Sequence, residues 1–123
     1  MAFPQTAADA YAGLDPVLTS PDRAEAMVFA RVTKRMETIF ADPSASSTSR
    51  VSVLHDNRRL WQAAAAASAD ENNALPQDLR ARIIGIAGFV DRHTSAVLRK
   101  EAPAAILIEI NRRIVGGLSA KAT

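Results

Sequence analysis

Few residues in this chain have the type and spacing needed for catalysis or metal binding. It has no cysteine and two histidines, His55 and His93, which fall on different predicted helices with no His-x-x-x-His or His-Glu spacing. The missing thiols exclude disulfides, cysteine-ligated zinc and thiol nucleophiles, and the histidine spacing predicts no metal site. The stretch IIGIAGF lacks the Lys-Ser/Thr ending of a phosphate-binding loop, and no serine lies in a nucleophile elbow. We therefore expect no enzymatic activity, no metal and no cofactor.

The remaining polar candidates are expected to support the fold. His93 lies in an apolar row, which favours a hydrogen-bonded core histidine over a catalytic base. His55 falls on a polar flank. Glu25 and Asp56 are candidates to pair with Arg58 as a structural ion pair.

Asn57 is the most informative polar residue, because it lies one helical turn before Trp61 inside an apolar stripe. A buried amide costs about 1–3 kcal/mol unless it is hydrogen-bonded. We expect Asn57 to bond to the DENNALP corner that follows its helix. Direct contact with a partner is the alternative.

The elements that position these residues are predicted to be helices throughout, since apolar residues recur with helical periodicity and no strand alternation is seen. Prolines at helix starts and the Gly116-Gly117 pair as a stop punctuate the pattern. The prediction is a single all-α domain over residues 1–123, a compact bundle or array of four main helices plus a short N-terminal helix. The expected helices span roughly residues 5–12, 21–42, 49–69, 76–101 and 103–116.

Composition agrees with a small globular domain. Of the 123 residues, 48% are hydrophobic and 23% charged, enough to build a core. No apolar run approaches the ~20 residues that cross a bilayer, and the first 17 residues resemble no signal peptide. We expect a soluble cytoplasmic protein with no membrane insertion.

Charge is unevenly distributed. From Arg80 onward, eight basic residues face three acidic ones, so that region carries +5 while the whole chain carries +2. Such asymmetry can indicate an acidic partner or RNA. Because no aromatic residues interleave with the basic ones, a solvated basic face is favoured over direct nucleic-acid binding.

Each main helix has an apolar stripe that predicts its core face. In helix order, the predicted stripes contain Val28, Phe29, Val32, Met36, Ile39 and Phe40; Val53, Leu54, Leu60, Trp61, Ala64 and Ala65; Leu79, Ile83, Ile86, Val90 and Val97; and Ile106, Leu107, Ile110, Ile114 and Leu118. The five alanines at 63–67 favour helix and permit a close helix approach.

Two features exceed what a simple core needs, and they predict a partner surface. The third long helix has a face of small residues that includes Gly85 and Gly88, with Phe89 beside it, so another helix could approach closely. The last helix carries Ile108 and Val115 well around from its core face. A partner or the N-terminal segment could cover this surplus, and the sequence favours neither.

Several motifs, taken together, resemble the FlaF family of flagellar biosynthesis regulators. They are NRRLW at 57–61, NNALPQDLRARI at 72–83, GFV at 88–90 and LIEINRRIVGGL at 107–118. The SPDRAEAMVFARVTKRM helix and the AYAG around Tyr11 are similar too, so the resemblance covers nearly the whole chain. The alanine run is a departure, because larger apolar residues are more typical after the tryptophan. The residues expected to carry the structural motif are Glu25, Asn57, Leu60, Trp61, Leu75, Pro76, Leu79, Arg80, Asn111 and Gly117.

The resemblance implies a small helical cytoplasmic protein without enzymatic activity. Its implied role is a flagellin-specific chaperone for type III export, which couples flagellin synthesis to filament assembly and acts with the regulator FlbT. The implied partners are the amphipathic terminal helices of flagellin, FlbT and the flagellar export apparatus. One alternative is a post-transcriptional regulator that contacts flagellin mRNA; another is an adaptor of FlbT only.

Overall fold

The computed structural model describes residues 21–122, with side chains described for residues 26–116. Four helices pack together, and no strand occurs in that range: α2 (Pro21–Ala41), α3 (Ser47–Ala69), α4 (Gln77–Leu98) and α5 (Ala105–Ala122). The all-α class with four main helices is confirmed. The predicted helix at 5–12 lies outside the described residues.

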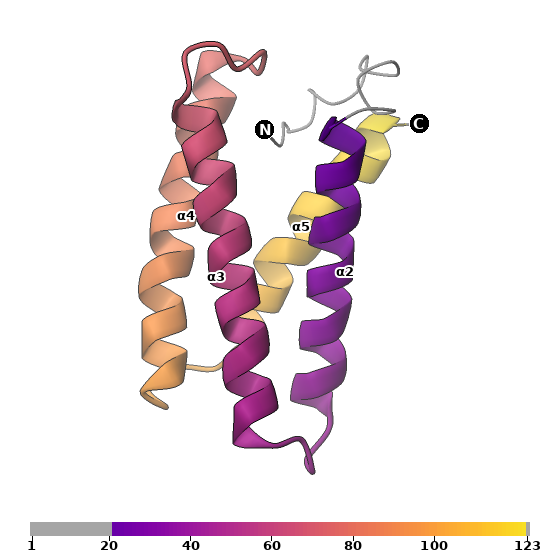
Figure 1. Ribbon diagram of the computed structural model, residues 1–123, viewed down its shortest axis with the longest axis vertical. Coiled ribbons are helices and arrows are strands. Elements are labelled where there is room, and N and C mark those ends of the chain that lie inside the picture. The colour runs from indigo at the N-terminus through magenta and orange to yellow at the C-terminus, as the bar shows by residue number, and fades with distance from the viewer. Residues whose placement is uncertain (1–20, 123) are drawn as a thin grey trace.

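Consecutive helices run antiparallel (Figure 1). The α3–α4 pair has the most extensive contact between described helices, α2 packs on both α3 and α5, and α5 touches α4 only sparsely. In Figure 1, α5 (yellow) rises obliquely behind the other helices from the end of α4 toward the start of α2. Short connections enforce this up-and-down order.

Local signals explain where most helices begin. Ser46 caps α3, its Oγ accepting from the Ser49 backbone N–H at 3.0 Å, which places the start two residues before the predicted one. Pro76 is the N-cap of α4. Asp78 lies in the first turn, where its negative charge interacts favourably with the helix dipole.

Two predicted helix ends are wrong. α4 ends at Leu98 rather than 101, because Lys100 adopts a left-handed backbone with φ of 64°. The Glu101 and Lys100 N–H groups bond back to the Ala96 and Val97 carbonyls, closing a Schellman motif. α5 begins at Ala105 and continues through the Gly116-Gly117 pair to Ala122. Glycine permits a left-handed stop but does not require one, and helix-forming residues follow the pair.

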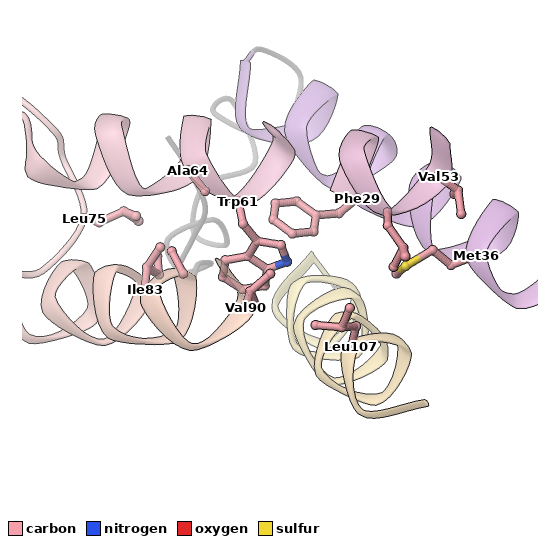
Figure 2. Close-up of a cluster of buried hydrophobic side chains, with 11 residues drawn as sticks. Phe29, Met36, Val53, Trp61, Ala64, Leu75, Ile83, Val90 and Leu107 are labelled. Atoms are coloured by element: carbon pink, nitrogen blue, oxygen red, sulfur yellow. The ribbon is translucent and has the colours of Figure 1, made fainter. Parts of the chain in front are cut away.

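The core lies where all four helices face one another (Figure 2). Trp61 is at its centre, and the Phe29 ring meets the indole edge-on with centroids 5.3 Å apart. Met36 and Leu107 are also fully buried. Buried residues of all four helices thus form one mostly aliphatic core around the Trp61 and Phe29 rings.

Two stripes were centred wrongly. In α2 the buried row is Phe29, Thr33 and Met36, while Val28 is 37% exposed, because consecutive residues lie about 100° apart around a helix. In α5 the buried residues are Leu107 and Asn111, Ala104 is buried just before the helix, and Ile106 is 41% exposed. Apolar residues cover a broad arc of α5, so the sequence did not show which side of this helix faces the core. The polar Asn111 lies at the centre of the face that does.

Candidate functional site

A chain of buried side-chain hydrogen bonds joins α3 to α5. The Trp61 indole Nε1 donates to Asn111 Oδ1 at 2.9 Å, and Asn111 Nδ2 donates to Asn57 Oδ1 at 2.7 Å. Both asparagines are 0% exposed. The expectation that Asn57 bonds to the DENNALP corner is therefore wrong, because its oxygen faces α5 instead. Its Nδ2 has no hydrogen-bond partner among the described residues.

Other residues hold the corner between α3 and α4. Asn73 Nδ2 donates to the Ala67 carbonyl at 2.9 Å, and Asn73 Oδ1 accepts from the Leu75 N–H at 2.8 Å. Arg80 Nη1 reaches back to the carbonyls of Ser68 and Asp70. These bonds satisfy the last carbonyls of α3, so this corner is a structural stop and restart.

Ion pairs link the helices differently from the predicted pairing. Asp56 binds Arg35 on α2 at 2.5 Å and Arg59 at 2.7 Å, not Arg58. Arg58 instead crosses to α4, donating to Ser95 Oγ at 2.6 Å and lying 3.1 Å from the Asp91 carboxylate. Side chains two residues apart on a helix point to different sides, which explains why Asp56 and Arg58 do not pair. The Glu25 side chain lies outside those described.

The histidines form no metal or catalytic cluster. Within the described side chains, no group of three or more His, Cys, Asp or Glu could hold a metal ion. His93 Nε2 lies 2.9 Å from the Pro103 carbonyl, which fits a protonated Nε2 tying α4 to the connection before α5. The ring is half-buried and stacks on Phe89 with centroids 5.4 Å apart, while His55 is exposed. His93 is thus hydrogen-bonded, as expected, but it lies at the edge of the bundle and not in the core.

The face of α4 turned away from the core carries apolar and small residues. Ile84 is 41% exposed and Phe89 is 38% exposed. Gly85 lies between them, and a Cβ there would have nothing within 4 Å. A Cβ at Gly88 would meet only Arg92 Nη1, at 3.4 Å. We call Ile84, Gly85, Gly88 and Phe89 the outer α4 face.

Ile108 and Val115 are placed elsewhere. Both are half-buried on α5 and pack against the core. Their side chains therefore belong to the α5 contacts of the bundle, and the structure does not join them with the outer α4 face into one surface. Ile108 additionally lines a groove beside Phe40.

Two grooves adjoin the Phe40 ring near the end of α2, and we call them the Phe40 grooves. The first lies between α2 and α5, has a volume of about 360 Å³, and includes Ala104 and Ile108 in its lining. The second lies where α3 begins and α4 ends, has a volume of about 280 Å³, and includes Val51, Leu98 and Lys100. Sequence reasoning missed these grooves, because they form only where parts of different helices meet.

Comparison of the sequence with models of protein families gives a match. A model of the flagellar protein FlaF matches residues 7–118 of the chain. This chain belongs to the FlaF family. No curated protein and no solved structure matched the chain.

The FlaF match spans the motifs that build the core. Asn57, Trp61 and Asn111, which form the buried hydrogen-bond chain, all lie within it, as do Leu75 and Arg80 at the α3–α4 corner. Gly117 lies inside α5, and Pro76 caps α4. Leu60 and Leu79 are half-buried against the core. These residues thus lie in the core, at the α3–α4 corner or within α5 of the bundle.

FlaF is a flagellar protein family and is not known as a family of enzymes. Within the described residues, no helix is long and apolar enough to cross a membrane. Among the described residues, the outer α4 face and the Phe40 grooves present apolar side chains to a partner, and Met27, Val28 and Ile106 are exposed elsewhere.

Proposed function

We propose that this protein is a cytoplasmic flagellin chaperone for type III export, which couples flagellin synthesis to filament assembly together with FlbT. The observation that carries the proposal is membership of the FlaF family over residues 7–118. Flagellin's terminal segments are amphipathic helices that would assemble prematurely if their apolar faces stayed free. A chaperone must cover such a face and release it at the export apparatus.

The outer α4 face supports this function. An amphipathic helix binds a helical scaffold through a row of apolar side chains that meets an exposed apolar surface. Ile84 and Phe89 provide that surface, and Gly85 and Gly88 leave room for a second helix to approach closely. We propose Gly85, Gly88 and Phe89 as flagellin contacts. Ile108 and Val115, which the sequence predicts as contacts, would touch flagellin through the exposed parts of their side chains on α5.

The experiment is a binding assay with purified flagellin and purified FlbT, each tested separately. The Phe89→Asp variant should lose flagellin binding and keep a helical circular dichroism spectrum, since Phe89 is exposed. Gln62→Asp is a matched control, because it adds the same charge at an exposed position of α3. An Ile108→Asp variant is a poorer test, because Ile108 packs against the core. Binding of FlbT alone would leave only an adaptor role.

The basic residues of the C-terminal half give little support to the alternative function of mRNA binding, because several of them are already paired. Arg99, Arg112 and Arg113 pair with glutamates, and Arg80 bonds to backbone carbonyls. RNA binding through the basic residues would weaken steeply with salt, whereas apolar contact with flagellin would change little. A salt titration of the two complexes separates these functions.

A further inference from the structure

The two Phe40 grooves adjoin one another at a single aromatic side chain. Phe40 lines both, so its ring forms an apolar ridge between them. Apolar side chains on successive turns of a helix project from one face about 5–6 Å apart. Two such side chains can enter the grooves on either side of the ridge, as in ridges-into-grooves packing.

The groove at the start of α3 is lined by apolar and basic side chains and by no carboxylate. Val51, Leu54 and Leu98 provide the apolar surface, and Val51 is 41% exposed. Arg50 and Lys100 provide the charge. Within the described residues neither of them forms an ion pair, in contrast to Arg35, Arg58, Arg59, Arg99, Arg112 and Arg113.

Asp42 interacts electrostatically with Arg50, and its carboxylate also accepts hydrogen bonds from Ser44. Asp42 Oδ1 accepts from the N–H and the hydroxyl of Ser44, at 2.9 Å and 2.7 Å. Arg50 Nη2 donates to the Asp42 backbone carbonyl at 2.9 Å, and its guanidinium carbon lies 5.7 Å from the centre of the Phe40 ring. These contacts hold the Arg50 cation over the Phe40 ring. The Asp42 carboxylate attracts Arg50, but the groove has two cations, Arg50 and Lys100, and no carboxylate in its lining, so its net charge is positive.

We propose that the Phe40 grooves bind an amphipathic helix of flagellin that carries a carboxylate beside its apolar row. The apolar row covers Phe40, Val51 and Leu98, and the carboxylate meets Arg50 and Lys100. The inference rests on the proposed function for its partner and adds a second contact surface, distinct from the outer α4 face. Charge complementarity selects an acidic segment over a basic one, since a cation placed between Arg50 and Lys100 is repelled.

Titration calorimetry of the full chain with purified monomeric flagellin tests the inference. Val51→Asp should weaken binding at least about tenfold, because it removes an apolar contact and its carboxylate competes with the partner's carboxylate for Arg50 and Lys100. Ser52→Asp is the matched control: it adds the same charge one residue along α3 at an exposed position outside the groove, and binding should stay within about twofold. Circular dichroism shows that each variant is folded.

Lys100→Asn isolates the charge, because asparagine tolerates the left-handed backbone that Lys100 adopts. Binding at low salt should weaken by roughly two- to fivefold, as expected for one exposed charge pair. High salt should remove that difference by screening. Lys34→Asn, at an exposed position on α2, should leave binding unchanged.

The outcomes separate the two proposals. If the wild-type protein does not bind flagellin, the chaperone function is contradicted and this site with it. If the wild-type protein binds but Val51→Asp and Lys100→Asn bind equally well, only the groove assignment is contradicted. If sedimentation shows a dimer that Val51→Asp disperses, a second copy of this chain occupies the grooves, and flagellin does not.

Discussion

The side-chain amide of Asn111 bonds to Asn57 through its nitrogen and to Trp61 through its oxygen, at 2.7 Å and 2.9 Å. The three side chains are buried at the centre of the bundle, where α5 faces α3. An apolar α5 could slide or rotate against α3 at little cost. The two hydrogen bonds fix one rotation and one register, because any other would bury the amides without partners.

Replacing Asn111 by alanine should therefore lower the free energy of unfolding by roughly 2–5 kcal/mol, since both Trp61 Nε1 and Asn57 Oδ1 lose their partner. Asn57→Ala should cost less, because it strands only Asn111 Nδ2 and removes the unpaired Asn57 Nδ2. Urea unfolding followed by tryptophan fluorescence measures both. Equal costs for the two variants would contradict the central place of Asn111.

Gly85→Ala should raise the free energy of unfolding by about 0.5–1 kcal/mol, because glycine within a helix is less favourable than alanine and the added methyl meets nothing. A larger side chain should separate stability from function. Gly85→Leu should stay folded yet weaken flagellin binding, whereas Ala66→Leu, at an exposed position on α3, should not. Thermal unfolding and calorimetry report the two effects, and full flagellin affinity in Gly85→Leu would remove the outer α4 face as a contact.

Lys100→Gly should stabilise the protein by about 0.5–1 kcal/mol. A left-handed backbone costs an L-residue roughly 1–2 kcal/mol, and the greater freedom of glycine in the unfolded chain offsets part of that gain. Arg99→Gly, one residue earlier at φ of −83°, should destabilise instead. Opposite signs in urea unfolding support the Schellman end of α4. A loss of stability in Lys100→Gly would mean that its side chain contributes more than its backbone strain costs.

The α2–α3 connection should contribute to the acid dependence of stability. Two hydrogen bonds lower the pKa of Asp42 below its ordinary value of 3.8. The bond from the Ser44 hydroxyl has the larger effect, and the bond from the Ser44 N–H has the smaller one. Because the folded pKa is the lower one, this contribution is present above the ordinary value and is lost as the pH falls through the folded pKa. Ser44→Ala should lose less stability than the wild type on acidification from about pH 5 to about pH 2. Ser52→Ala, at an exposed position without this contact, should follow the wild-type curve.

Helix existence and most helix starts could be predicted from the sequence because their signals are local. Pro21 and Pro76 mark two starts, and the serines before α3 include its cap. Helix ends were less predictable. Lysine is rarely left-handed, so Lys100 gave no stop signal, and the Gly116-Gly117 pair permits a stop that α5 does not use.

The hydrogen-bond partners and the grooves depend on tertiary packing. Asn57 and Asn111 are 54 residues apart, and each could only be recognised as a polar residue within an apolar stripe. Because buried amides need hydrogen-bond partners, the presence of two asparagines in apolar stripes could have predicted that they bond to each other. The Phe40 grooves combine residues from α2, α3, α4 and α5, and no spacing within one helix predicts them.

Seeded polymerisation of purified flagellin tests the proposed chaperone function. Filament growth is followed by light scattering, with and without an equimolar amount of this protein. We predict that the wild-type protein suppresses growth, that Phe89→Asp loses this effect, and that Gln62→Asp retains it. Filament growth at an unchanged rate in the presence of excess wild-type protein would contradict the claim that this FlaF protein holds flagellin as a monomer.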